Sequence, residues 1–134
     1  MKRTYDTIRV GFIGTGRISD LHALEYINDP GAQIVALCDH SPDLARARAA
    51  AWGLHDPFIT DDMHALLKRP DIDLVEILLP HHLHKPAALA AIAAGKAVSL
   101  QKPMCLNVAE ADEVVAAAAA AAVRSAEVIL GYAR

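Results

Sequence analysis

Short apolar runs alternate with amphipathic or alanine-rich stretches along the whole chain. The apolar runs have the length and composition of β-strands, over residues 8–13, 33–38, 58–60, 74–79, 97–101 and 128–130. The stretches between them predict helices over residues 18–27, 42–51, 63–67, 85–94 and 108–124. Strands that alternate with helices predict an α/β fold, a doubly wound parallel sheet of the Rossmann type with right-handed crossovers.

Local signals mark the ends of several predicted helices. Ser41 stands where an N-cap belongs, just before a proline at the first helical position. Gly95 follows the helix over 85–94 as its C-cap. Asn107 and Glu110, three residues apart, resemble a capping box at the start of the alanine-rich helix. These signals fix the predicted element boundaries independently of the apolar pattern.

The chain has 134 residues, the length of one domain with a core of its own, spanning 1–134. The apolar run over 74–79 is typical of a central parallel strand covered on both faces. In the first helix the apolar positions follow helical spacing, at Ile18, Leu21, Leu24 and Ile27.

A glycine pair lies between the first strand and the first helix, in the stretch Gly14-Thr15-Gly16. The turn requires Gly14 because the backbone there takes angles that a Cβ would obstruct. Gly16 leaves room where a pyrophosphate approaches the main chain, and the start of the helix offers N–H groups to the anion. Ser19 is the third small residue, which lets the helix pack closely on the strand. A strand-to-helix turn without a ligand is the simpler alternative.

An acid follows the second strand, as the dinucleotide-binding fingerprint requires. Asp39 comes directly after the run over 33–38 and can accept hydrogen bonds from the hydroxyls of an adenosine ribose. A carboxylate there repels a 2′-phosphate, so NAD is expected ahead of NADP. His40 in its charged form would favour a phosphate and keeps NADP open. The alternative role for Asp39 is a turn or helix-cap acid.

Charge and cysteine content exclude other classes of function. The net charge is −3 and no basic block is present, which argues against nucleic acid or an anionic membrane surface as partner. Cys38 and Cys105 form no CxxC pair, and residues 1–7 do not resemble a signal peptide, so a cytoplasmic setting is expected. Trp52 is expected to pack at a helix end.

Histidines crowd the loop after the fourth strand, at His81, His82 and His84. Ligands so close together would not all face one ion without strain, and no cysteine or carboxylate cluster lies near them in the sequence. We therefore expect no metal site. His82 is expected in solvent and His84 near the cofactor, while His22 is expected on a helix face.

Four stretches together resemble the N-terminal domain of the Gfo/Idh/MocA oxidoreductase family. They are Val10 to Gly16 with His22 after it, Leu79-Pro80-His81-His82-Leu83-His84, Ala94 to Val98 leading into Gln101-Lys102-Pro103, and Gly131-Tyr132-Ala133-Arg134. Two positions depart from the family pattern: His81 replaces an asparagine, and Gln101 replaces a glutamate. Gln101 keeps the hydrogen-bonding reach of a glutamate but not its charge, so it supplies no carboxylate.

The resemblance implies an NAD(P)-dependent dehydrogenase that moves hydride to or from a hydroxyl-bearing carbon of a sugar, inositol or related polyol. It implies Lys102 as the catalytic lysine that reaches the substrate oxygen. Burial could lower the pKa of Lys102 toward a useful value. A surface lysine beside a proline turn is the alternative. The cofactor-binding residues implied are Gly14, Gly16, Arg17, Ile18, Asp39, Pro80, His84, Gln101 and Pro103.

The family continues into a substrate domain that this sequence lacks. We therefore expect the chain to bind NAD without turning over substrate, and to self-associate through apolar surface that a second domain would cover. A non-catalytic module that senses NAD(H) is the second hypothesis, favoured by Gln101. A scaffold whose glycine turn binds nothing is the third.

Overall fold

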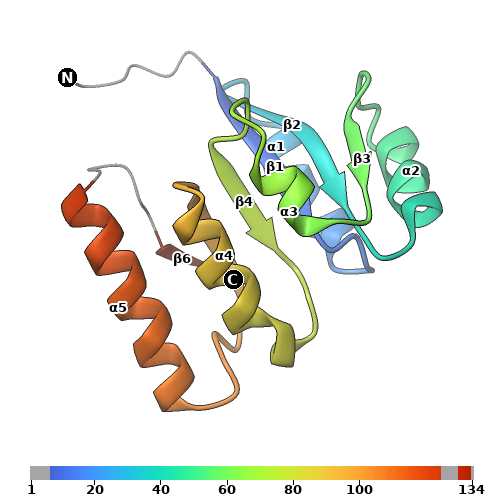
Figure 1. The fold of residues 1–134 in the computed structure, drawn as a ribbon. Helices are drawn as coiled ribbons and strands as arrows, with labels where there is room; N and C mark the ends of the chain where they lie inside the picture. The colour runs from blue at the N-terminus through green and yellow to red at the C-terminus, as the bar shows by residue number, and fades with distance from the viewer. Residues whose placement is uncertain (1–6, 125–129, 134) are drawn as a thin grey trace.

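The computed structural model describes residues 7–124 and 130–133. Six parallel strands form one sheet in the order β3-β2-β1-β4-β5-β6 (Figure 1). The strands are β1 (Ile8–Ile13), β2 (Ala32–Cys38), β3 (Phe58–Thr60), β4 (Leu74–Ile77), β5 (Ala97–Gln101) and β6 (Leu130–Ala133). The helices are α1 (Ser19–Ile27), α2 (Pro42–Ala51), α3 (Met63–Leu67), the 3₁₀ turn η1 (His81–Leu83), α4 (His84–Ala93) and α5 (Val108–Arg124). The predicted doubly wound parallel sheet is confirmed.

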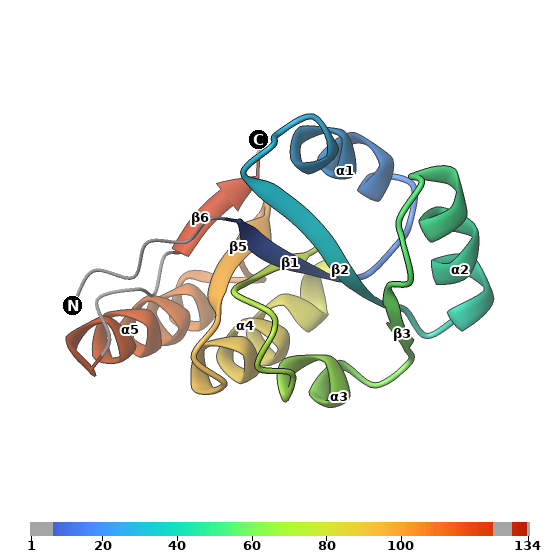
Figure 2. The same cartoon turned by 90° about the horizontal axis from the view of Figure 1, so that it is seen from above.

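The helices cover the two faces of the sheet as separate layers. Helices α1 and α2 lie on one face, and α3, α4 and α5 lie on the other (Figure 2). Side chains of β1 alternate between the two layers: Val10 and Phe12 pack in the α1–α2 layer, and Ile13 packs in the other. Trp52, the C-cap residue of α2, packs on Phe12 with ring centroids 5.4 Å apart, as expected of a helix-end residue.

Most predicted boundaries agree with the structure. The strands over 58–60 and 97–101 and the helix over 108–124 have the predicted limits. The Ser41 hydroxyl accepts a hydrogen bond from the Leu44 N–H, and the Asn107 side chain accepts one from the Glu110 N–H. The central strand ends at Ile77, two residues before its predicted limit. Of the predicted last strand, residues 128 and 129 lie outside the described residues.

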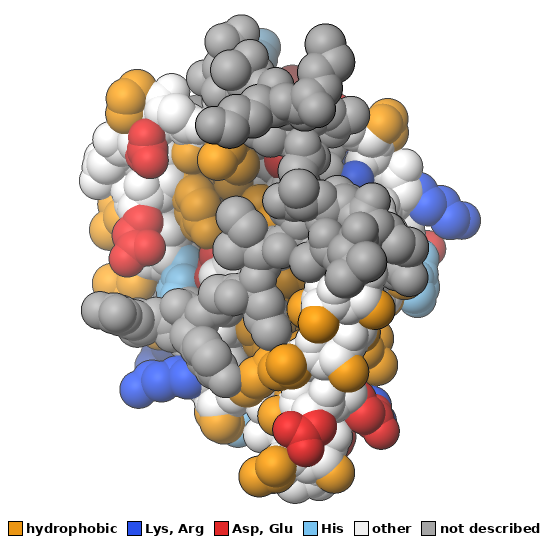
Figure 3. Space-filling model, turned by 90° about the vertical axis from the view of Figure 1, so that its left-hand side faces the viewer, with side chains coloured by type: hydrophobic (Ala, Val, Ile, Leu, Met, Phe, Trp, Pro, Cys, Tyr) orange, Lys and Arg blue, Asp and Glu red, His pale blue; other side chains and the backbone are white. Residues whose placement is uncertain are grey.

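The apolar stripe of α1 does not face the sheet. Leu21 and Leu24 are 64% and 52% exposed, and Ile18 and Ile27 are also exposed. The buried positions of α1 are instead Ser19, His22 and Ala23. Figure 3 shows further hydrophobic side chains on the face that carries α5, where Val108 and Val115 are exposed. The spacing therefore predicted the helix correctly but not which side of it is buried.

A polar cluster replaces apolar packing where α1 crosses β4 and β5. Glu76 interrupts the apolar run of β4 and is fully buried. Its carboxylate accepts hydrogen bonds from the Tyr26 hydroxyl and the Ser99 hydroxyl, and its Oε1 lies 3.1 Å from Nδ1 of His22. Burial raises the pKa of Glu76, and the hydrogen bonds from Tyr26 and Ser99 together with the nearby His22 oppose this only in part.

Because its pKa is raised on folding, Glu76 contributes more stability in its protonated form, and this contribution is lost as the pH rises through the folded-state pKa. Glu76→Gln keeps an acceptor for Tyr26 and provides an amide donor to His22 and Ser99. We expect the variant to gain stability relative to the parent chain as the pH rises above about 4, the ordinary pKa of a glutamate, measured by urea unfolding from pH 4 to pH 8. A constant difference across this range would contradict the assignment.

Candidate functional site

The residues predicted to bind the cofactor follow four neighbouring strands at one edge of the sheet. Gly14 follows β1, Asp39 follows β2, Pro80 comes after β4 and Lys102 follows β5. Because all the strands are parallel, their carboxyl ends meet at this edge, where open α/β sheets bind ligands. Backbone hydrogen bonds continue past the strand ends: Gly14 N donates to Cys38 O at 2.8 Å, and Leu78 N donates to Ile13 O at 2.9 Å.

The two glycines of the turn have different surroundings. Gly14 has φ +98°, and a Cβ there would overlap the backbone carbonyl of Leu78. Gly16 has no heavy atom within 4 Å of the position that a Cβ would take. Gly14 is thus required by the fold, whereas the space over Gly16 is open to a ligand.

Thr15, between the glycines, is held from both sides. Its N–H and its hydroxyl both donate to Oδ2 of Asp39, at 2.9 and 2.8 Å. Its carbonyl accepts from Nε of Arg48 at 3.1 Å, and Arg48 also pairs with Asp20 at 2.8 Å. Trp52 donates its indole N–H to the other oxygen of Asp20. Side chains from α1, from α2 and its C-cap, and from the loop after β2 therefore hold the turn in shape.

The sequence contains no local motif from which the Arg48–Asp20 pair, or its role beside the turn, could have been predicted. Arg48 lies in the last turn of α2, more than thirty positions from the turn it holds. Only the packing of α2 beside α1 brings them together.

Asp39 is mostly engaged by the protein itself. Oδ2 takes both Thr15 donors, and Oδ1 accepts from Ser41 N at 2.9 Å with Nδ1 of His40 at 3.2 Å. Burial by itself raises the pKa of Asp39, but the hydrogen bonds from Ser41 and Thr15 outweigh it, so the pKa lies below its ordinary value. The His40 side chain is 96% exposed and free to turn away. Oδ1 then has one acceptor direction for a ribose hydroxyl.

A cleft of about 450 Å³ opens beside Asp39, within the size range of small-molecule sites. Its lining is largely apolar and comes from the ends of β1 and β2, the starts of α3 and α4, and the loop after β4. It consists of Ile13, Cys38, Asp39, His40, Asp61, Met63, Leu79, Pro80, Leu83, Pro86 and Ala87. Burial raises the pKa of the Cys38 thiol to about 11, so it lines the cleft as an apolar group.

Sequence reasoning had found Asp39 and Pro80 but not most of this lining. From the sequence, Leu79 was predicted only as part of a strand and Met63 only as part of a helix. Their positions at the carboxyl end of the fourth predicted strand and at the start of a short helix after the third would have indicated the same edge.

The segment after β5 is more open. Lys102 and Pro103 are exposed and joined by a cis peptide bond, and Gln101 Oε1 accepts from Lys102 N at 3.0 Å. Arg17 and Ile18 are also exposed, beside the start of α1, which has no side-chain cap. Burial was considered above as a way to lower the pKa of Lys102. Among the residues that the structure describes, none buries this side chain.

His84 lies inside the protein and not at the surface of the cleft. Its side chain is fully buried. Nδ1 lies 2.8 Å from Pro103 O and 3.1 Å from Met104 O, and Nε2 lies 2.9 Å from Leu79 O. Both ring nitrogens are committed to backbone carbonyls, which leaves neither for a direct contact with a cofactor. His82, by contrast, is exposed.

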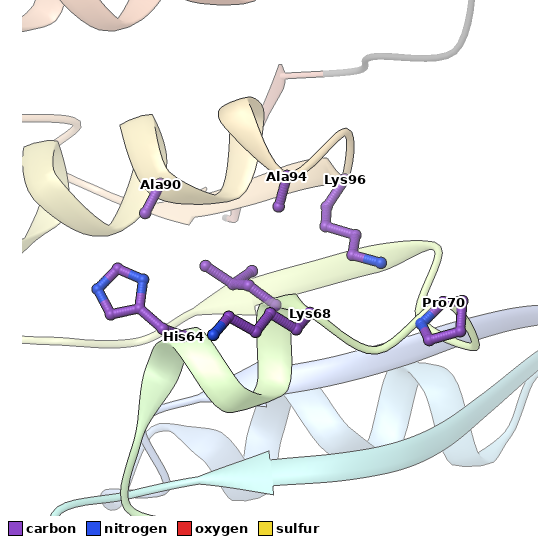
Figure 4. A pocket seen from close by; sticks show the side chains of 7 residues that line it. His64, Lys68, Pro70, Ala90, Ala94 and Lys96 are labelled. Carbon is purple, nitrogen blue, oxygen red and sulfur yellow. The ribbon is translucent and has the colours of Figure 1, made fainter.

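A second hollow, of about 390 Å³, lies between α3 and α4, away from the predicted residues (Figure 4). Its walls include Leu67, Ala90 and Lys96. Lys96 Nζ donates to the carbonyls of Arg69 and Ile72, at 2.6 and 2.8 Å, so this lysine serves the fold. Within the described ranges no cluster of three or more metal-ligating side chains occurs, and none of the helices found there is long and apolar enough to cross a membrane.

Comparison with known proteins agrees with this geometry. Residues 8–128 match the model of the Gfo/Idh/MocA family, described as an oxidoreductase family with an NAD-binding Rossmann fold. The chain is 34% identical over 114 residues to an inositol 2-dehydrogenase of Acidothermus cellulolyticus, which covers 80% of this chain and 33% of that protein.

Two solved structures are similar as well. An NAD-binding oxidoreductase from Klebsiella pneumoniae superimposes with a TM-score of 0.82 at 32% identity, over 95% of this chain and 34% of that one. A biliverdin reductase from Synechocystis, in complex with biliverdin and NADP⁺, gives 0.80 at 30% identity, over 93% and 37%. The chain thus spans about a third of the length of these relatives.

Proposed function

Since the chain belongs to the Gfo/Idh/MocA oxidoreductase family and matches its NAD-binding domain, we propose that it binds a nicotinamide dinucleotide along the carboxyl edge of its sheet. The observation that carries the proposal is the open space over Gly16, at the same edge of the sheet as a cleft lined in part by Asp39. The pyrophosphate lies over Gly16, against the backbone of Arg17 and Ile18. The adenosine occupies the apolar cleft, in which Pro80 forms the wall toward the nicotinamide, and Pro103 borders the nicotinamide itself.

NAD is the preferred cofactor in this proposal. The remaining acceptor direction of Asp39 Oδ1 receives one ribose hydroxyl, and the charge of the carboxylate repels a 2′-phosphate. His40 offers a counter-charge to such a phosphate when protonated, so NADP binds more weakly but measurably. The Synechocystis relative holds NADP⁺, which supports keeping NADP as the second cofactor.

The whole protein transfers hydride to or from a hydroxyl-bearing carbon of a sugar, inositol or related polyol, as the inositol 2-dehydrogenase relative suggests. A bound nicotinamide supplies or accepts the hydride at its C4 atom. Loss of hydride from a carbinol carbon requires removal of the hydroxyl proton. Lys102, exposed at the same edge, hydrogen-bonds the substrate oxygen and takes that proton, or returns it in the reverse direction.

Calorimetric titration of the chain with NADH, NADPH and ADP-ribose tests the binding proposal. We expect all three to bind, NADH more tightly than NADPH. A folded chain that ignores millimolar NADH would contradict it and favour the unliganded scaffold. With NAD and a panel of polyols we expect no NADH formation from this chain alone, and genuine NADH formation would contradict that expectation.

Chemical acetylation of lysines in the same samples tests whether Lys102 lies beside the bound nicotinamide. We expect NADH to protect Lys102 from an acetylating reagent and ADP-ribose to leave it reactive, because only NADH carries the nicotinamide. Lys68, exposed at the distant hollow, is the control and should react equally in all samples. Equal reactivity of Lys102 with both ligands would favour the non-catalytic sensor, to which Gln101 already lends support.

A further inference from the structure

His84 joins two segments that reach the carboxyl edge from different strands. It is the first residue of α4, and its ring lies between the carbonyl of Leu79, after β4, and those of Pro103 and Met104, after β5. Leu79 lines the cleft beside Asp39. Pro103 directly follows Lys102. The imidazole therefore lies between the adenosine side of the edge and the lysine side.

The hydrogen-bond chemistry of the ring determines its protons. A neutral imidazole has one N–H and one lone pair. Here each nitrogen faces a carbonyl oxygen at 2.8–2.9 Å, so a lone pair on either one would repel the oxygen opposite. Only a ring with an N–H on both nitrogens satisfies all the contacts. The carbonyl oxygens replace the water that a buried cation loses. The rings of His81 and His84 pack in an edge-to-face arrangement, with centroids 5.5 Å apart.

We propose that His84 is a positioning residue, a doubly protonated bridge that holds the Lys102–Met104 segment at a fixed distance from the Leu79–Pro80 segment. The bridge sets where Lys102 stands relative to the cleft, and it acts on the nicotinamide half of the dinucleotide without touching it. The bridge itself is inferred from the contacts of the His84 ring, whereas its effect on the nicotinamide half rests on the proposed function.

Two substitutions each keep one end of the bridge. His84→Asn retains an amide nitrogen near the Nδ1 position, and His84→Gln retains one near the Nε2 position. Dissociation constants for NADH and for ADP-ribose, which lacks the nicotinamide, are measured for both variants and the parent chain. His82→Gln, at an exposed histidine of the same loop, is the matched control.

We expect both His84 variants to bind NADH about tenfold more weakly while the affinity for ADP-ribose changes less than about twofold, because loss of one charge-assisted hydrogen bond releases the lysine segment. The control should bind both ligands like the parent chain. Parallel weakening of both ligands, or no change in either, would overturn the proposal and reduce His84 to a fold residue.

The ring protons are measured directly on the unsubstituted chain by ¹⁵N–¹H correlation NMR, which requires neither a variant nor a cofactor. We expect protons on both nitrogens of His84. A singly protonated ring in the folded chain would overturn the bridge. A parent chain that binds neither NADH nor ADP-ribose would instead contradict the proposed function and leave the NMR result to decide the bridge.

Discussion

Gly14→Ala is expected to cost on the order of 3 kcal/mol of folding free energy, enough to remove much of the stability of a domain of this size. A side chain at φ +98° is strained by itself, and the new Cβ meets the Leu78 carbonyl, which is fixed backbone at the end of β4. Relief requires the turn to move away from β4. Urea unfolding measures the loss, and a variant as stable as the parent would contradict this reading of the turn.

Gly16→Ala is the matched control for stability and the sharper test of binding. Nothing surrounds the added methyl group, so we expect a stability within about 1 kcal/mol of the parent chain. The methyl group does occupy the space proposed for the pyrophosphate. We therefore expect NADH affinity to fall by at least about tenfold, and unchanged affinity would contradict the approach of the pyrophosphate at this point.

Asp39→Ala is expected to weaken NADH binding by about a hundredfold and NADPH binding much less. The variant loses the ribose acceptor and also the partner that orients Thr15 in the turn, whereas removal of the negative charge relieves repulsion of a 2′-phosphate. Calorimetric titration with both cofactors gives the ratio. Asp43→Ala, at an exposed acid in the first turn of α2, should leave both affinities unchanged. Equal losses for NADH and NADPH in Asp39→Ala would contradict the ribose assignment.

The same substitution should change acid stability. Because the folded-state pKa of Asp39 is lowered, its ionised form contributes stability that is present above the unfolded-state value, about 4, and is lost as the pH falls through the folded-state pKa. The difference in free energy of unfolding between the parent chain and Asp39→Ala should therefore be largest near pH 7 and should decrease at acidic pH. Urea unfolding across this range measures it.

The fold could be predicted from the sequence because its signals are local and repeated. Strand composition, the Ser41 cap and the glycine pair each depend on a few neighbouring residues, and the alternation of strands and helices admits few topologies. The edge where Gly14 and Asp39 meet follows from the parallel arrangement alone.

The parts that could not be predicted depend on contacts between distant elements. The apolar positions of α1 indicated a helix, but the buried side was decided by Glu76, whose carboxylate required polar partners from α1 and β5. Nothing near Arg48 in the sequence links it to the turn. His84 was expected beside the cofactor because its motif lies at the right edge. Its actual neighbours, the carbonyls after β5, are about twenty positions away.

The fluorescence of the sole tryptophan of the chain can report on the strand-to-helix turn. Trp52 reaches Thr15 through two intermediates, Asp20 and Arg48, so a ligand that shifts the turn perturbs the surroundings of one fluorophore. Its emission also overlaps the absorption of reduced nicotinamide. The unlabelled protein therefore carries its own spectroscopic reporter, which distinguishes a ligand that only fills the cleft from one that also engages the strand-to-helix corner.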